Sequence, residues 1–502
     1  MSAQLYAPKV YLFAFHLFKT PDADTNSSVK DPNLLWDKCH EIFSKFHIKQ
    51  QLKLHPPIPE KRRFDLLDGE NPDAIVLEIK TEIPYKDHEL KLEGFAYPLQ
   101  IYDTYGLGLN LGFPDPPLEN GHKIPAVDIS VLEKFNPDSC LLPDIIKSYF
   151  GQTLIITAWL SEEQKQKDAQ FLKSLADECL REFVYDSHKY PELYQKGQLF
   201  GSPIFEYGLI NDRENYCHIL VWLFSDSETD KSFQECYQLL LDLFFYRNKV
   251  ITEFWNSRDT YRDAYQEYEQ IQKLVRKTFN ELPQADTLTE DNLKYLKGQL
   301  KAMAKRTVEY SDLLRDLESR RNSIAINTDN YKNKLRIIRN RLDSSKELDL
   351  SFLVSFAQEN CSVFQEQIQG DLGYFVPGAS LLEKAISSIR GIVEIDQAER
   401  DRLREEREKK REEDEETKQE ERELKEKEKE RRLERTVQTL GVALGTGGLV
   451  ASSFNHIDKP FALPGSPKAT DAFHPVTVTL FWSFLIALIF GGMTWWLTRS
   501  KK

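Results

Sequence analysis

The fold expected for this chain of 502 residues is decided by residues 436–457, which read TVQTLGVALGTGGLVASSFNHI and contain no Asp, Glu, Lys or Arg. A second stretch of this kind, residues 475–498, reads PVTVTLFWSFLIALIFGGMTWWLT. A helix of roughly 20 residues crosses the hydrocarbon core of a membrane, so stretches of 22 and 24 residues are long enough. Basic residues lie on the outer sides, within 431–435 and in the tail 499–502. Because cytoplasmic flanks are enriched in Lys and Arg, we expect two transmembrane helices in an inner or plasma membrane, an outer loop at 458–474 and cytoplasmic termini.

The first of these spans has one polar face. Its small and polar residues recur at intervals of three and four, which places them on one side of a helix: Gln438, Gly441, Gly445, Gly448, Ser452 and Asn455. Small residues allow helix backbones to approach closely, and Gly441 with Gly445 forms the simplest motif of that kind. The same face also suits an aqueous pore formed by several copies, because exposed oxygens replace the hydration shell of an ion. Packing and pore lining both stay open, and in the second case Asn455 and Asp458 would lie at the outer mouth.

A highly charged helix is expected to lead into the first span. Residues 399–435 contain 17 acidic and 15 basic residues among 37. Opposite charges therefore often lie three or four positions apart, where each pair stabilises a helix by about 0.2 to 0.5 kcal/mol. We expect a stalk helix over 379–435, preceded over 346–378 by a short helix and a linker. The linker contains four residues that disfavour helix: Gly370, Gly373, Pro377 and Gly378.

The chain ahead of residue 346 is predicted to form two parts. Over 1–225, stretches typical of strands alternate with helical patterns, which favours an α/β or α+β cytosolic domain built on one sheet. Over 230–345, apolar residues recur with a period of seven, which predicts two long antiparallel helices. The heptad positions of the second helix, apolar except at Thr307, Arg321 and Thr328, are Leu293, Leu296, Leu300, Met303, Thr307, Tyr310, Leu314, Leu317, Arg321, Ile324, Thr328, Tyr331, Leu335 and Ile338.

No motif for catalysis is present in the sequence. It contains no Walker A, H-E-x-x-H or G-x-S-x-G pattern, and its six cysteines have no metal-ligand spacing. Residues 106–112, GLGLNLG, are followed by prolines instead of a helix, so we expect a turn or hairpin there and not a phosphate loop. A net charge of −13 is not typical of a nucleic-acid binder. We therefore expect a protein that is not an enzyme, has no cofactor and does not bind nucleic acid.

In the order of its parts, the whole chain resembles the CorA-type metal-ion transporters. That family has a soluble N-terminal domain, long helices, a stalk helix that continues into the first of two spans, and a basic tail. The Gly-Met-Asn motif of the family is absent here, because the first span ends in Ser452-Ser453-Phe454-Asn455-His456 and only Asn455 matches. The resemblance implies a homopentamer in membrane lipid, a pore lined by the polar face of the first span, and a divalent cation as the transported or regulatory ion.

The leading hypothesis is thus a CorA-like oligomeric membrane channel or transporter for cations with altered selectivity. One alternative is a membrane-anchored cytosolic scaffold or sensor that conducts no ions. A further alternative is a CorA-like effector that is gated by a signalling partner.

Overall fold

The computed structural model describes residues 3–19, 31–58, 60–68, 75–86, 88–114, 126–184, 186, 190–282, 288–342 and 348–408, together with residues 429, 433, 434 and 437. The chain divides into two compact units. The first comprises Met1–Asp263 and Arg315–Tyr374, and the second comprises Ala264–Leu314 and Phe375–Lys502.

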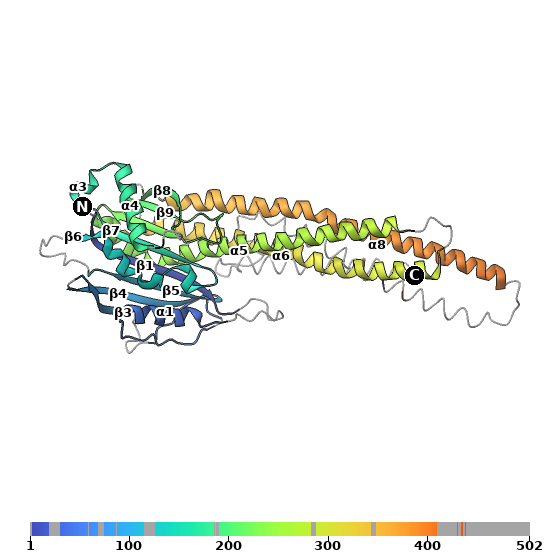
Figure 1. The fold of residues 1–502 in the computed structure, drawn as a ribbon, viewed down its shortest axis with the longest axis horizontal. Helices are drawn as coiled ribbons and strands as arrows, with labels where there is room; N and C mark the ends of the chain where they lie inside the picture. The colour runs from blue at the N-terminus through green and yellow to red at the C-terminus, as the bar shows by residue number, and fades with distance from the viewer. Residues whose placement is uncertain are drawn as a thin grey trace, which may run out of the picture. The chain divides into compact units, whose positions relative to one another are not determined.

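The first unit is built on one large, mostly antiparallel sheet (Figure 1). Its strands run β2-β4-β5-β1-β7-β10-β9-β8, with β3 paired to β4 and β6 paired to β1. The parallel pair is β7 and β10. The strand bounds are β1 Gln4–Leu17, β2 Arg63–Asp65, β3 Leu77–Tyr85, β4 His88–Ile101, β5 Thr104–Gly112, β6 Ala126–Asp128, β7 Gln152–Trp159, β8 Leu193–Leu199, β9 Ser202–Tyr207 and β10 Ile219–Phe224.

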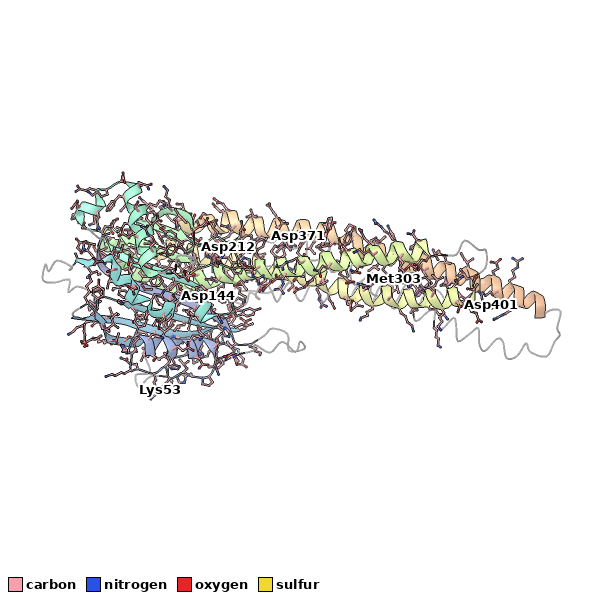
Figure 2. All side chains as sticks on the ribbon, viewed as in Figure 1. Lys53, Asp144, Asp212, Met303, Asp371 and Asp401 are labelled. Atoms are coloured by element: carbon pink, nitrogen blue, oxygen red, sulfur yellow. The ribbon has the colours of Figure 1, made fainter. Side chains whose placement is uncertain are left out.

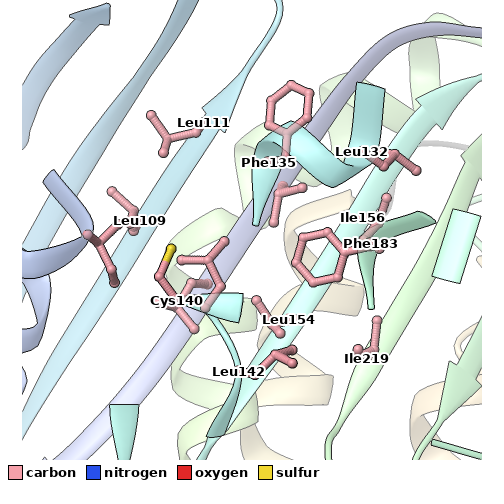
Figure 3. Close-up of a cluster of buried hydrophobic side chains, with 14 of the residues drawn as sticks. Leu109, Leu111, Leu132, Phe135, Cys140, Leu142, Leu154, Ile156, Phe183 and Ile219 are labelled. Atoms are coloured by element: carbon pink, nitrogen blue, oxygen red, sulfur yellow. The ribbon is translucent and has the colours of Figure 1, made fainter. Parts of the chain in front are cut away.

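Aliphatic side chains on one face of the sheet form a core with helices α1 and α4 and the 3₁₀-helix η1 (Figure 3). Because side chains alternate along a strand, β1 contributes Val10, Leu12 and Ala14 to this core. Figure 3 shows Leu154 and Ile156 of β7 on either side of the Phe183 ring of α4. The helices on the described chain up to β10 are α1 Leu34–Lys45, η1 Ile129–Phe135, η2 Pro137–Ser139, α2 Pro143–Ile146, α3 Glu162–Lys165 and α4 Ala169–Phe183.

The opposite face of the sheet is aromatic and packs against the first part of α5 (Ser227–Asn280). The rings of Tyr11 and Phe233 meet edge to face at a centroid distance of 4.8 Å. Phe13 lies 5.3 Å from Tyr237 in the same arrangement. Such pairs add about 0.5 to 1.5 kcal/mol to the free energy of burying the rings. Two apolar faces therefore hold the sheet between separate layers of helix.

Of the two alternatives expected for the Gly-rich stretch 106–112, the hairpin is confirmed and the turn is wrong: the stretch is part of the buried strand β5, which forms an antiparallel hairpin with β4 and lies between β4 and β1. Its glycines give space to neighbouring side chains. A Cβ atom at Gly108 would lie 2.5 Å from the hydroxyl of Tyr237 on α5, and one at Gly106 would lie 2.9 Å from Leu99. The intervening leucines face the aliphatic core. Glycine is therefore required here by close packing, and the chain does not reverse at this point.

The helices that follow α5 are α6 Glu290–Leu342, α7 Ser351–Ser355, the π-helix η4 Phe356–Asn360 and α8 Cys361–Glu408. The predicted linker before residue 379 is wrong, because α8 passes through it with Pro377 inside the helix. Gly370 and Gly373 have open space where a Cβ would lie. The helix instead starts within the predicted linker region at Cys361, and the part of the predicted stalk that is described continuously ends at Glu408.

The second unit contains the end of α5, the start of α6 and α8 from Phe375. Its helices pack through aromatic residues: the hydroxyl of Tyr310 donates to the carbonyl of Phe375 at 2.6 Å. A Cβ at Gly378 would lie 2.7 Å from the ring of Tyr268, so glycine permits close approach of the helices. Ten of the fourteen predicted α6 positions are buried in the chain as a whole: Leu296, Met303, Tyr310, Leu314, Leu317, Ile324, Thr328, Tyr331, Leu335 and Ile338.

The membrane part of the expected fold class is wrong. The structure is a mixed α/β fold with a large sheet and long helices, and no helix in its described part is long and apolar enough to cross a membrane. The long helices α5, α6 and α8 carry charged side chains along their lengths, and each such residue costs about 2.5 to 3.5 kcal/mol at the centre of a membrane helix. The expectation of a transmembrane channel is corrected accordingly. Apart from Val437, the two spans proposed from the sequence lie outside the described residues, as do their loop and tail.

Candidate functional site: a ligand pocket in the first unit

A pocket of about 660 Å³ opens in the first unit. Three segments line it: the stretch from α2 into β7, the loop before β10, and α5. Asp144, on the first of these segments, is labelled in Figure 2. The lining residues most relevant to recognition are Lys147, Gln152, Arg213, Tyr216, His218, Asn248 and Trp255. Volumes of roughly 300 to 1,000 Å³ are typical of small-molecule sites.

Backbone geometry fixes the first segment of the pocket wall. Helix α2 ends at Ile146 and is followed by Lys147, which has a left-handed φ of 53°; the loop then turns through Gly151 with a φ of 77°. Phe15 on β1 holds the loop, because its N–H donates to Gly151 O at 3.1 Å and its carbonyl accepts from Phe150 N at 3.0 Å. The loop is therefore tied to the centre of the sheet.

The imidazole of His16 also holds this loop in place through a hydrogen bond. Its Nδ1 accepts from the backbone N–H of Tyr149 at 3.2 Å. The opposite nitrogen, Nε2, lies 2.8 Å from the carbonyl of Asp31 and can therefore donate to it. Burial lowers the pKa of His16, although the Asp31 carbonyl and carboxylate oppose the shift. A neutral His16 with the proton on Nε2 satisfies both contacts.

Aromatic side chains form the second wall. The rings of Tyr216 and Trp255 meet edge to face at 5.0 Å, and Trp255 Nε1 donates to the carbonyl of Ile210 at 2.9 Å. The guanidinium of Arg213 lies 5.9 Å from the Trp255 ring centre and forms an ion pair with Asp259 at 2.6 Å. This wall offers a planar apolar surface beside charged groups.

Behind the pocket lies a buried ionic network centred on Glu206 of β9. Arg247 Nη2 donates to Glu206 Oε1 at 2.5 Å, and His218 Nε2 contacts the same oxygen at 3.1 Å. Gln195 Nε2 donates to the other carboxylate oxygen at 2.6 Å. Arg247 Nη1 reaches forward to the hydroxyl of Tyr216 at 2.7 Å. The side chains of Glu206, His218 and Arg247 are each at most 5 % exposed.

The protonation states of this network follow from its charges. Burial would raise the pKa of Glu206, but the charge of Arg247 and the hydrogen bonds from His218 and Gln195 outweigh it and lower the pKa to about 2. Burial and the positive charge of Arg247 lower the pKa of His218 to about 4, against the opposing effect of Glu206. At neutral pH the network therefore holds an ionised carboxylate, an ionised guanidinium and a neutral imidazole.

Glu206, His218 and Thr153 form a hydrogen-bonded series that is similar to a catalytic triad. In such a triad the imidazole is the base and the hydroxyl is the nucleophile. His218 Nδ1 lies 2.9 Å from Thr153 Oγ1. That hydroxyl also accepts from Asn248 Nδ2 at 3.0 Å, it is fully buried, and Thr153 is not among the residues that line the pocket. A nucleophile must reach its substrate, so this chain of hydrogen bonds orients His218 and does not present a reactive hydroxyl.

Gln152 contributes a buried acceptor near the pocket. Its Nε2 donates to the carbonyl of Leu141 at 2.5 Å, which fixes the orientation of the amide because the flipped group would set two oxygens against each other. Gln152 Oε1 has no hydrogen-bond partner among the residues that the structure describes. Such a buried oxygen costs about 1 to 3 kcal/mol when unpaired. The oxygen itself is buried and does not face the open volume of the pocket.

The site residues expected from the sequence are not part of this pocket. Gln438, Gly441, Gly445, Gly448, Ser452, Asn455 and Asp458, expected to line a pore, lie outside the described residues. Within the described ranges no cluster of three or more His, Cys, Asp or Glu side chains could hold a metal ion. The pocket residues went unnoticed, although a signal existed: Glu206 and Arg247 interrupt the apolar runs PIFEYG and LFFYRNKV.

The sequence matches no protein-family model and no curated protein, and no solved structure matches either. The resemblance to CorA-type transporters therefore stays a prediction, and the geometry of the pocket is the observation from which function is inferred.

Proposed function

We propose that this protein is a receptor for a small polar ligand of no net charge, which binds in the pocket of the first unit. The supporting observation is the pocket itself, whose lining combines the aromatic rings of Tyr216 and Trp255 with polar residues such as Asn256. A few polar groups set in a largely apolar concave surface are typical of small-molecule sites.

The charges around the pocket favour a neutral or zwitterionic ligand. Asp144 and Lys147 lie on one lining segment, and Arg213 and Glu214 lie on another. Each of these two segments therefore carries one acidic and one basic residue. The ring of His218 is neutral and both of its nitrogens are engaged. A polyanion such as a nucleoside triphosphate would find no excess of positive charge here, whereas an amino acid or a nucleoside would face balanced charges.

A binding role fits the pocket better than a catalytic one. General acid-base catalysis uses a group with a pKa near the working pH and within reach of the substrate. His218, the imidazole in the pocket lining, has a pKa of about 4 and is held on both sides by Glu206 and Thr153. We therefore propose that the pocket recognises its ligand without transforming it.

The proposal is tested by ligand binding to the full chain. We would measure native mass spectra of the protein after incubation with a small-molecule extract, and calorimetry with glutamine, glutamate, lysine, adenosine and adenosine monophosphate. Two variants on α5 locate the binding site. The test variant Asn256→Trp fills the pocket, and the control variant Gln266→Trp adds the same ring at an exposed position.

We expect a ligand without net charge to bind, with an affinity at least about tenfold weaker in Asn256→Trp and unchanged in Gln266→Trp. Binding weaker than about 1 mM for every compound, with no bound mass from the extract, would contradict the proposal. If Asn256→Trp binds the ligand as tightly as the wild type does, the ligand binds outside this pocket. If glutamate or lysine binds more tightly than glutamine, or adenosine monophosphate more tightly than adenosine, the proposed ligand class is wrong.

A further inference from the structure

The π-helix Phe356–Asn360 is an irregular segment between α7 and α8. A π-helix has hydrogen bonds from residue i to residue i+5, is rare, and often occurs as one inserted turn at a functional site. Because an α-helix turns about 100° per residue, loss of the inserted residue would rotate the two flanking helices relative to each other by about that angle. An α-helical form of this segment would therefore differ from the π-helix by a large, defined rotation.

Side chains from helix α5 and strand β8 hold the two ends of the π-helix. At its start, the guanidinium of Arg247 lies 4.9 Å from the ring centre of Phe356. At its end, the hydroxyl of Tyr194 donates to Asn360 Oδ1 at 2.9 Å. The preceding turn is held as well, because Ser355 Oγ donates to Gln195 Oε1 at 3.2 Å. The π-helix thus depends on contacts outside its own backbone.

The same side chains contact the pocket wall on their other side. Arg247 donates to the pocket residue Tyr216 and to Glu206. Glu206 in turn is bonded to the pocket residue His218 and to Gln195. Gln195 therefore contacts both the carboxylate and the turn before the π-helix. Two short routes, one through Arg247 and one through Glu206 and Gln195, join the pocket to Phe356–Asn360.

We propose that Arg247 and Glu206 couple the pocket to the π-helix, so that a ligand in contact with Tyr216 or His218 changes the stability of Phe356–Asn360. This inference rests on the proposed function for its physiological meaning. The coupling itself is a property of the unliganded protein. Coupling carried by packed and hydrogen-bonded side chains is established only when a change at one end alters a two-state element at the other.

The experiment is hydrogen exchange on the full chain, read in peptides that cover residues 352–364. Tyr216→Phe removes the hydroxyl that accepts from Arg247. The matched control Tyr149→Phe removes a hydroxyl from another pocket residue that lies outside the network. We expect Tyr216→Phe to accelerate exchange in 352–364 about tenfold, since a hydrogen bond to a charged group is lost, and Tyr149→Phe to change it less than about twofold.

A second variant tests the reverse direction. Phe356→Leu removes the ring beneath Arg247, and we expect exchange in peptides over 210–219 to accelerate about threefold, as the loss of a cation–π contact implies. Its control is Val363→Ala at an exposed position of α8, which should leave those peptides unchanged. Reciprocity of this kind is required of any equilibrium coupling.

The coupling is refuted if Tyr216→Phe leaves exchange in 352–364 within about twofold of the wild type, or if Tyr149→Phe accelerates it equally. If Tyr216→Phe does not fold, as judged by circular dichroism, Phe356→Leu decides alone, and an unchanged 210–219 segment overturns the proposal. Because these variants need no ligand, the coupling can hold where no ligand is found, and ligand binding can be shown where the coupling fails.

Discussion

The substitution Glu206→Gln should strongly destabilise the first unit. Glu206 accepts hydrogen bonds from Arg247 and Gln195 and contacts His218, and its side chain is only 5 % exposed. Glutamine keeps the shape but removes the negative charge, so the buried guanidinium of Arg247 loses its counter-ion. Removal of one partner of a buried ion pair costs about 3 to 5 kcal/mol.

The pKa of the carboxyl group gives an independent magnitude. A pKa lowered from 4.5 to about 2 corresponds to roughly 3 kcal/mol of preference for the ionised form in the folded protein. The sign follows from linkage: this contribution is complete above pH 4.5 and is lost as the pH falls from 4.5 towards 2. Both routes therefore give a loss near 3 kcal/mol for Glu206→Gln at neutral pH.

The assay is urea unfolding at pH 7, followed by the near-ultraviolet circular dichroism of the aromatic core. The control Glu82→Gln removes an exposed partner of Lys91 at 3.9 Å and should change the unfolding free energy by less than about 0.5 kcal/mol. The double variant with Arg247→Met should lose less than the two single losses combined, because it leaves no unpaired charge. A loss below about 1 kcal/mol in Glu206→Gln, or strict additivity in the double variant, would refute the reasoning.

Two further predictions concern packing and pH. Gly108→Ala should lower the unfolding free energy by about 1 to 3 kcal/mol, because the new Cβ would lie 2.5 Å from the Tyr237 hydroxyl and 3.0 Å from Leu241. Gly298→Ala, where α6 has open space for a Cβ, should raise the unfolding free energy by up to about 1 kcal/mol. Urea titration measures both changes. The pKa of His218 is lowered from 6.5 to about 4, so the unfolded chain binds a proton in this window before the folded protein does. The unfolding free energy should therefore fall by roughly 3 kcal/mol from pH 6.5 to pH 4, and in His218→Gln this part of the pH dependence should be absent.

The long helices could be predicted from the sequence because their pattern is local. On α6, apolar residues that recur every seven positions coincide with buried ones such as Met303, Tyr310 and Tyr331. A helix that packs along one stripe repeats its environment at a regular interval. The sequence therefore contains the answer within a short window, without knowledge of the distant partner.

Strand β5 could not be predicted in this way, because its glycines are required by side chains that are distant in the sequence. Gly108 makes space for Tyr237 of α5, and Gly112 makes space for Lys9 of β1. In isolation, a run of glycines suggests a turn. Only the side chains that arrive from elsewhere in the chain show that the missing Cβ atoms serve packing within the sheet.

The candidate pocket was missed for the same physical reason. Its walls come from residues near 150, 215 and 250, and no one segment carries a motif. The prediction of a break before residue 379 failed differently: Gly370 and Gly373 weaken a helix by about 1 kcal/mol each, and Pro377 by more. Contacts of the surrounding helices, such as that of Tyr310 with the Phe375 carbonyl, offset these costs and α8 stays continuous.

The buried network places the charges of Glu206 and Arg247 between the sheet and α5, where most side chains are apolar. An apolar group of similar size in place of a buried ion pair often leaves stability unchanged or increases it, so net stability does not explain Glu206 and Arg247. What an apolar pair could not supply is direction: the guanidinium fixes the Tyr216 hydroxyl, and the carboxylate fixes His218. Both of these residues line the pocket. The charges are therefore best understood as determinants of pocket geometry, and substitution of both by apolar residues should preserve the fold while weakening ligand binding.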